Sequence, residues 1–201
     1  MQPNGYINGL ALLEAAEYCG HQIRSCGHES ILTKNRLIQD GINVIFGAHI
    51  DPDQHQDLPQ NVVIFNTEQL PENSVWVNDT YKKILQNNFV WDYSNINYSL
   101  IAHENKALIG FYYDQELRRI PLAQEKKWDL LFYGSINDRR KNILDGLTSR
   151  GLKIKMLFGV YGSERDSIIA QSRAVLNLHF YDSEILEQIR IFYPLINQVP
   201  V

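Results

Sequence analysis

The sequence lacks several features that would assign a protein to a specialised class. It contains only two cysteines in 201 residues, Cys19 and Cys26, which are too few for a disulfide scaffold and fit free thiols in a reducing compartment. No apolar run approaches the roughly 20 residues that a membrane-spanning helix needs. The first residues also lack the basic stretch and apolar core of a signal peptide. We therefore expect a cytoplasmic protein without a membrane span.

Common signatures of nucleotide and hydrolase chemistry are missing too. The sequence has no G-x-G-x-x-G, no G-x-x-x-x-G-K-[ST] and no G-x-S-x-G, which argues against a dinucleotide-binding enzyme, a P-loop protein and a nucleophile-elbow hydrolase. A net charge of −4 argues against a nucleic-acid partner. Acidic side chains predominate in residues 1–125 and basic ones in residues 126–201. The second part therefore suits a small anionic ligand.

What is present is an ordinary globular composition, with 44% hydrophobic and 21% charged residues, and an alternation of strands and helices. In the second half the apolar runs 128–134, 152–160 and 174–180 predict strands, and the stretches 137–151, 163–172 and 183–197 predict helices. Asn137 or Asp138 can cap the first helix, and Ser163 can cap the second in a capping box. This order predicts an α/β fold with a parallel sheet.

The first half alternates less regularly. We expect strands at 42–48, 61–68, 89–94 and 107–113, and helices at 9–20 and 78–87. The polar stretch 114–127 is the candidate linker, so we expect one domain over 1–125 and another over 126–201. The first half opens on a helix and the second stops as a strand begins. We therefore expect two incomplete lobes, truncated at both ends, whose open sheet edges favour a homo-oligomer.

The stretch FYGSINDRRKNIL (132–144) carries the clearest functional signal. A strand ends at Gly134 and Ser135, and Arg139, Arg140 and Lys141 follow at the start of a helix. Backbone amides and the helix N-terminus attract anions, and arginines bind phosphate oxygens in pairs of hydrogen bonds. The pattern thus indicates a phosphate site, although a solvated helix start remains the alternative.

Other polar residues also follow predicted strands, where ligands bind in open parallel sheets. These candidates are Gly159, Gly162, His179, Glu184, Glu187, Arg190, Asn66, Glu68 and Asp92. Glu184, Glu187 and Arg190 can share one helix face, as ribose ligands or as a solvated ion-pair face. Asp92 or Glu68 can act as a general base. Alternatively, Asp92 caps the next turn and Glu68 pairs with a cation.

The loop AHIDPDQHQD (48–57) spaces two histidines and two aspartates two residues apart, at His49, Asp51, Asp53 and His55. Metal sites use such residues. Because Pro52 and the surrounding polar residues are typical of a solvated connection, we expect no metal site here.

Taken in order, the segments INVIFGAH, VVIFNTEQL, VWDYS-x-x-N, LLFYGSINDRR and FGVYGSERDSIIAQSRAVLNLHFYDSEILEQIR resemble bacterial glycosyltransferases of the GT-B type, in particular the family-1 or CgeB-like group. The resemblance implies two Rossmann-like lobes facing each other across a cleft. The N-terminal lobe would bind the acceptor, and the C-terminal lobe would bind a nucleotide-sugar donor.

Carried onto this sequence, the resemblance implies a donor site and an acceptor side. Gly134, Ser135, Arg139 and Arg140 would face the diphosphate, and the turn from Gly159 to Gly162 would face the base. Glu187 would hold the ribose, with His179, Tyr181 and Arg190 nearby. Asp92 and Glu68 would border the acceptor.

The resemblance also implies that protein cations replace a metal, so that sugar transfer needs no cofactor besides the nucleotide-sugar substrate. The alternative is a truncated, non-catalytic glycosyltransferase-like module that binds a nucleotide or a protein partner.

Overall fold

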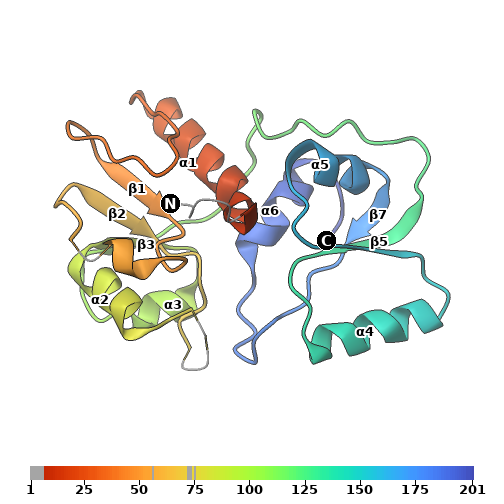
Figure 1. Ribbon diagram of the computed structural model, residues 1–201. Helices are drawn as coiled ribbons and strands as arrows, with labels where there is room; N and C mark the ends of the chain where they lie inside the picture. The colour runs from red at the N-terminus through yellow and green to blue at the C-terminus, as the bar shows by residue number, and fades with distance from the viewer. Residues whose placement is uncertain (1–6, 56, 72–73, 75) are drawn as a thin grey trace. The chain divides into compact units, whose positions relative to one another are not determined.

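The computed structural model describes residues 7–55, 57–71, 74 and 76–201, and these form two compact units, Met1–Phe111 and Tyr112–Val201. Each unit is an α/β fold built on a parallel sheet, which confirms the predicted fold class at that level (Figure 1). Among the described residues, no helix is both long and apolar enough to cross a membrane.

The first unit contains a four-stranded sheet with the order β1-β2-β3-β4. Its elements are η1 (Ile7–Leu12), α1 (Leu13–Ser25), β1 (Asn43–Phe46), η2 (Pro52–His55), β2 (Val62–Phe65), α2 (Asp79–Asn87), β3 (Phe89–Asp92), α3 (Asn95–Leu100) and β4 (Lys106–Leu108). Each strand pairs in parallel with the strand that precedes it in the chain. Successive connections therefore run in one direction, and α2 and α3 cover the same face of the sheet (Figure 1).

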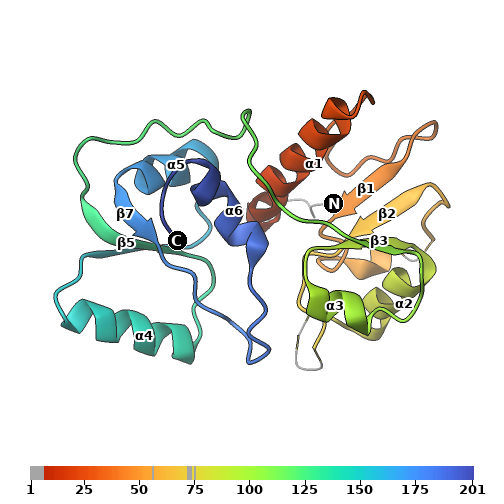
Figure 2. The same cartoon turned by 180° about the vertical axis from the view of Figure 1, so that it is seen from behind.

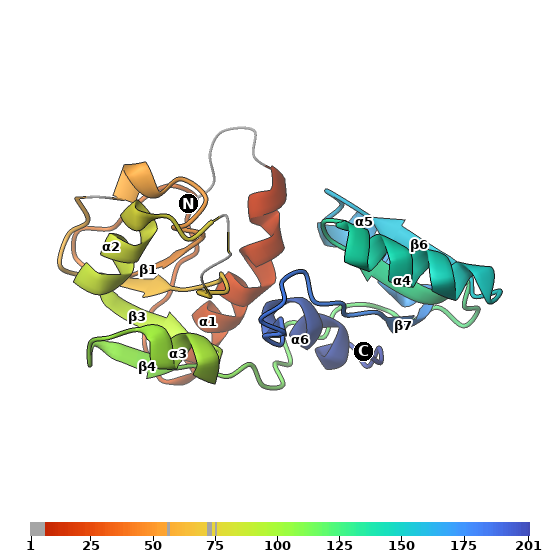
Figure 3. The ribbon, with the colours of Figure 1, turned by 90° about the horizontal axis from the view of Figure 1, so that it is seen from below.

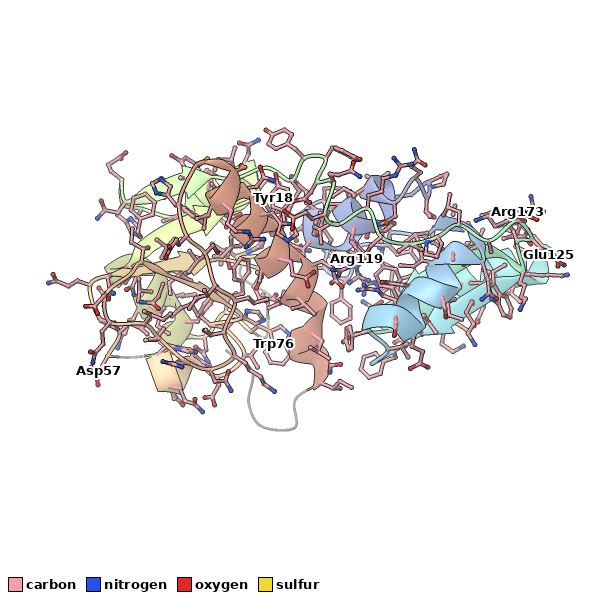
Figure 4. The ribbon with its side chains drawn as sticks, turned by 90° about the horizontal axis from the view of Figure 1, so that it is seen from above. Tyr18, Asp57, Trp76, Arg119, Glu125 and Arg173 are labelled. Atoms are coloured by element: carbon pink, nitrogen blue, oxygen red, sulfur yellow. The ribbon has the colours of Figure 1, made fainter. Side chains whose placement is uncertain are left out.

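Alternation along the strands divides the core of this unit into two layers. On the α2 and α3 face, Ile45, Ile64 and Val90 pack with apolar residues of α2 and with Ile101, the residue that follows α3. On the opposite face, the Phe65 ring lies 4.7 Å from that of Phe46, measured between ring centroids. An aromatic group that includes Tyr18 of α1, labelled in Figure 4, continues this layer toward α1. The period of two in the sequence produces this arrangement because successive side chains point to opposite faces.

The second unit contains a three-stranded sheet with the order β6-β5-β7. Its elements are β5 (Trp128–Tyr133), α4 (Asp138–Ser149), β6 (Ile154–Leu157), α5 (Gly162–Ala170), β7 (Ser172–Val175) and α6 (Gln188–Ile196). The chain leaves β5 through α4 to reach β6 on one side, then returns through α5 to β7 on the other side. Accordingly, α4 and α5 cover opposite faces of the sheet, as Figures 1 and 2 show.

The boundary between the units lies in the chain between Phe111 and Tyr112, whereas the sequence suggested a boundary near residue 125. The polar stretch that follows Tyr112 belongs to the second unit because Asn197 fixes it there. The Asn197 amide oxygen accepts hydrogen bonds from the backbone of Arg119 and Ile120, both at 2.8 Å, and its nitrogen donates to the Leu117 carbonyl at 3.0 Å. Leu117 is fully buried.

Helix ends follow local capping signals in part. Asn137 caps α4 as predicted, and its side chain accepts a hydrogen bond from the Arg140 amide. The predicted capping box at Ser163 is wrong, because α5 already begins at Gly162 and its N-cap residue is Tyr161. The last helix, α6, labelled in Figure 3, starts only at Gln188. Glu184, expected on this helix, lies before it with a φ of 51°.

Candidate functional site

The carboxyl ends of the strands in the first unit converge on a buried polar network. Asn66 follows β2 and Asp92 ends β3, and the two strands are neighbours in parallel register. The Asn66 side-chain nitrogen donates to Asp92 Oδ2 at 2.6 Å, and both residues are completely buried. Asn66 Oδ1 accepts from the Tyr81 hydroxyl at 2.7 Å, which connects the network to α2.

Asp92 is committed to holding the turn that follows it. Its Oδ1 accepts hydrogen bonds from the Ser94 amide at 2.7 Å and from the Asn97 side chain at 3.3 Å. Burial raises the pKa of the Asp92 carboxyl to about 6, although the hydrogen bonds oppose the shift. A base acting on an acceptor hydroxyl would need an accessible oxygen, which the buried carboxylate does not present. The structure instead matches the alternative interpretation, in which Asp92 caps the next turn.

The same network holds the main chain of Glu68. The Glu68 carbonyl accepts hydrogen bonds from the side chains of Asn66 and Asn97, each at 2.9 Å. Its amide donates to Asn66 Oδ1 at 3.1 Å. The backbone of Glu68 is therefore fixed from both directions, and the direction in which its side chain leaves the turn is fixed with it.

The Glu68 side chain meets a histidine from the neighbouring strand end. His49 follows β1, and its Nε2 lies 3.4 Å from Glu68 Oε1, while its Nδ1 lies 3.3 Å from the Thr67 hydroxyl. The His49 ring packs edge-on against Tyr81 and against Trp76, which is labelled in Figure 4. Burial lowers the pKa of His49 to about 4, so the ring is neutral near pH 7.

The expected solvated loop around His49 is wrong at its two histidines, since His49 and His55 are only 8% and 2% exposed. The apolar run that ends immediately before His49 was the sequence feature that could have indicated its burial. Within the described ranges, no three His, Cys, Asp or Glu residues are grouped to hold a metal ion.

In the second unit, the carboxyl ends of β5 and β7 lie side by side. The connections from β5 and from β6 run in opposite directions, and ligands of open α/β sheets bind beside such a reversal. Gly134 has a φ of 132°, and the Arg190 guanidinium lies where a β-carbon would stand. Arg190 Nη1 also donates to the Tyr133 carbonyl at 2.6 Å. Glycine is required here because of both the backbone conformation and this close approach.

Arg140 is buried, with 1% of its surface exposed. Its guanidinium donates to the Leu178 carbonyl through Nε at 3.0 Å, to the Ser135 carbonyl at 2.8 Å and to Glu187 Oε1 at 2.8 Å. Burial lowers the pKa of Arg140 to about 10, which leaves the group charged at pH 7. Arg140 thus holds the segments that follow β5 and β7 and the Glu187 carboxylate, and its predicted contact with a diphosphate stays a prediction.

Glu187 is the N-cap residue of α6 and joins two arginines. Besides Arg140, it pairs with Arg190, whose Nη2 lies 2.6 Å from Glu187 Oε2. Both carboxylate oxygens are thus occupied by cations. The predicted helix face shared with Glu184 is wrong, because Glu184 lies before α6. The contact of Glu187 with a ribose, which the resemblance implies, stays a prediction.

The remaining candidates lie around this network. Arg139 is exposed, and its Nη1 donates to the His179 carbonyl at 2.7 Å. Ser135 is exposed beside it. The His179 ring has a buried Nδ1 that finds no hydrogen-bond partner among the described residues. Tyr181 packs its ring against Phe180, 5.0 Å away between centroids. Strand order thus brings the β5–α4 turn and the segment after β7 together.

Gly159 and Gly162 flank the turn between β6 and α5. Their φ values are 69° and 59°, and a β-carbon added to either would meet no described atom within 4 Å. Both positions favour glycine because of backbone conformation, and the main chain beside them is open within the described part of the unit.

Comparisons with known proteins give relatives from one virus. The chain is 33% identical over 138 residues to the protein named "Uncharacterized protein L137" of Acanthamoeba polyphaga mimivirus, over 66% of this chain and 19% of that protein. It is 35% identical over 156 residues to "Uncharacterized protein R358" of the same virus, over 75% of this chain and 53% of the relative. "Uncharacterized protein L140" is 29% identical over 147 residues, covering 70% of this chain and 48% of that protein.

The chain therefore spans between about a fifth and about half of the length of these relatives. No family model matches the sequence, and no solved structure matches it significantly.

Proposed function

We propose that the chain is part of a GT-B-type glycosyltransferase with Rossmann-like units, which moves a sugar from a nucleotide-sugar donor to an acceptor without a metal ion. The observation that carries the proposal is the exposed guanidinium of Arg139 at the first turn of α4, beside the Gly134–Ser135 turn. A helix N-terminus attracts negative charge, and an arginine beside it adds donors for phosphate oxygens.

The buried network gives this turn the rigidity that charge stabilisation requires. Arg140 bonds the Ser135 carbonyl, Arg190 bonds the Tyr133 carbonyl, and Glu187 joins the two arginines. Preorganised donors stabilise a developing charge better than donors that must first reorganise. In this proposal Arg139 and the amides of the turn contact the leaving diphosphate, while Arg140, Glu187 and Arg190 position them.

The β6–α5 turn supplies a place for the nucleoside. Gly159 and Gly162 leave the main chain between them open to close approach. A base bound there would be recognised by backbone donors and acceptors, as the resemblance implies. His179 and Tyr181 follow β7, on the other side of β5, and are the candidates for the ribose or sugar side.

A second candidate is a non-catalytic module that binds a nucleotide or a protein. It is favoured by the pairing of Glu187 with two arginines, which occupies the carboxylate that the resemblance assigns to the ribose.

Titration calorimetry tests the donor site. The whole chain is titrated with UDP, GDP, ADP and CDP, first without metal and then with magnesium. We expect one diphosphate to bind with micromolar affinity without metal, and Arg139→Ala to weaken it at least tenfold.

Arg150→Ala is the matched control, because it removes one exposed arginine from the other end of the same helix. The proposal fails if no diphosphate binds, or if Arg139→Ala binds as tightly as the control. Binding without any sugar transfer would favour the non-catalytic module.

A further inference from the structure

We propose that Tyr193 is a positioning residue, which holds the β6–α5 turn in place relative to the β5–α4 turn so that the nucleoside and the diphosphate of one ligand bind together; this inference rests on the proposed nucleotide-sugar site. Tyr193 is 3% exposed and lies in α6, three residues after Arg190. Residues three apart in a helix lie on one face, so these two side chains leave α6 on the same side.

Arg190 joins α6 to the first of the two turns. Its Nη1 donates to the Tyr133 carbonyl at the end of β5, and the Tyr133 hydroxyl donates to the Arg190 carbonyl at 2.8 Å. The Arg190 guanidinium also lies where a β-carbon of Gly134 would stand. The first turn of α6 is therefore fixed against the β5–α4 turn, where the diphosphate is proposed to bind.

Tyr193 joins the same helix to the second turn. Its hydroxyl donates to Asp166 Oδ2 at 2.8 Å, and Asp166 lies in α5, four residues after Gly162, with which that helix begins. Asp166 Oδ1 accepts from Arg165 Nη2 at 2.9 Å, and the Arg165 guanidinium lies 4.9 Å from the centre of the Tyr193 ring. The start of α5, and with it the end of the β6–α5 turn, is thus held by α6.

Arg119 fixes the direction in which the Tyr193 hydroxyl donates. The Nε of Arg119, labelled in Figure 4, donates to this hydroxyl at 3.1 Å. Because a guanidinium has no acceptor, the hydroxyl accepts from Arg119 and directs its own proton to Asp166. Burial raises the pKa of Tyr193 to about 12, so this proton is present at pH 7. The Arg119 backbone is itself anchored to Asn197, the residue that follows α6.

The helix α6 thereby connects two turns that follow different strands. Because β5 and β6 pair in parallel, both turns lie at the same edge of the sheet. A ligand that contacts both turns gains from their fixed spacing, since it does not have to order one of them on binding. Without the Tyr193 hydroxyl, binding must supply this order, and the nucleoside then adds less to the affinity of the diphosphate.

Titration calorimetry with two probes tests this role. The whole chain is titrated, without metal, with inorganic pyrophosphate and with whichever of UDP, GDP, ADP and CDP binds most tightly. The dissociation constant for pyrophosphate divided by that for the nucleoside diphosphate measures what the nucleoside adds, and we expect this ratio to exceed one in wild type. Tyr193→Phe should lower the ratio about tenfold, since one hydrogen bond is worth about that factor, and should leave the pyrophosphate affinity within about twofold of wild type.

Tyr113→Phe is the matched control, because it removes the hydroxyl of an exposed tyrosine in the same unit, one that donates to Gln115. It should keep the wild-type ratio. A smaller fraction of folded protein would affect both probes alike and leave the ratio unchanged, so the ratio reports positioning and not stability.

Asp166 tests the same contact from the α5 side. Asp166→Ala removes the acceptor of the Tyr193 proton and should also lower the ratio. Its effect and that of Tyr193→Phe should be less than additive in the double variant, because both break one hydrogen bond. Asp166→Asn keeps an oxygen that can accept from the Tyr193 hydroxyl, and it should restore most of the ratio lost in Asp166→Ala.

The outcomes separate this inference from the proposed function. If wild type binds the nucleoside diphosphate and Tyr193→Phe keeps the wild-type ratio, or weakens both probes equally, the positioning role is wrong and the diphosphate site stands. A wild type that binds both probes with the same affinity also overturns the role. If wild type binds neither probe, the proposed function fails, and the role of Tyr193 falls with it.

Discussion

The Tyr133 hydroxyl donates a hydrogen bond of 2.8 Å to the main-chain carbonyl of Arg190. In an uninterrupted helix this carbonyl would accept from the amide of residue 194, but Pro194 has no amide hydrogen. The last residue of β5 therefore satisfies a carbonyl that the proline leaves open within α6. The proline and the tyrosine together join the helix to the carboxyl edge of the sheet, beside the proposed diphosphate site.

Tyr133→Phe should destabilise the second unit by about 1–2 kcal/mol, because the Arg190 carbonyl loses its partner. Pro194→Ala restores an amide at the helical position. In the double variant, the loss from Tyr133→Phe should therefore be smaller than in the wild-type background. Urea unfolding of the four proteins measures this coupling, and strictly additive effects would contradict the exchange of partners.

Substitutions of Arg139 and Arg140 should have different effects on diphosphate affinity and on the free energy of unfolding. Arg140→Met leaves Glu187 and two carbonyls without their buried donor, and we expect a loss of about 3–5 kcal/mol in the free energy of unfolding. Arg139→Ala should change that free energy by less than about 0.5 kcal/mol, because the side chain is exposed. Thermal unfolding of both variants, compared with their diphosphate titrations, checks the division. Equal losses of stability would contradict it.

Gly134 and Gly146 form a matched pair of glycine positions in the second unit. Gly134→Ala should destabilise the chain, since its β-carbon meets the Arg190 guanidinium and its φ is 132°. Gly146→Ala lies inside α4 with no described atom near the new β-carbon, and it should stabilise the chain by about 0.5–1 kcal/mol. Melting temperatures should shift in opposite directions, and a fall in both would show that α4 is packed more tightly than described.

Asp92 should make the first unit less stable as the pH rises. Its pKa is about 6 in the folded chain against an ordinary value of 3.8, so the folded state keeps a proton that the unfolded chain has lost. Stability falls between about pH 4 and pH 6, by about 3 kcal/mol from this group. Asp92→Asn removes this fall. Urea unfolding across that range measures the free energy of unfolding of both proteins. The value for Asp92→Asn minus the value for wild type should increase with pH.

His49 should have the opposite effect. Burial lowers its pKa from 6.5 to about 4, so between those values the unfolded chain binds a proton that the folded chain excludes. Stability from this group rises with pH by about 3 kcal/mol over that window. His49→Gln removes the rise. Its free energy of unfolding minus that of wild type should therefore decrease as the pH increases. Parallel curves for His49→Gln and Asp92→Asn would contradict both assignments.

Locally encoded elements were predictable from the sequence, as α4 shows. Its Asn137 cap and the change to a positive φ at Gly151 depend only on neighbouring residues. The start of α6 was not predictable, because Glu187 at its N-cap is held by Arg140, 47 residues away. Likewise, the strand predicted at 174–180 is displaced to Ser172–Val175, since the Leu178 carbonyl serves Arg140. A short apolar run does not show which of its backbone groups will bond to a side chain and which will bond to the neighbouring strand.

The candidate site followed the same division. The sequence marked Glu68, Asp92 and the β5–α4 turn because polar residues followed apolar runs. It did not show that Asp92 would be sealed in the core or that His49 would reach Glu68, because both depend on which strands become neighbours. The helix α3 was not predicted; Ser94 caps it, but the six-residue helix is too short for a periodic pattern to stand out.

The strand orders also bear on how the two units are made during translation. In the first unit, every strand pairs with the one synthesised just before it, so the sheet can grow by addition at one edge as the chain emerges. In the second unit, β5 pairs with β6 first, and its other edge stays open until β7 arrives, some forty residues after β5 begins. Nascent chains that stop between β6 and β7 therefore leave one edge of β5 unpaired. An unpaired strand edge favours aggregation, and the arrival of β7 closes it.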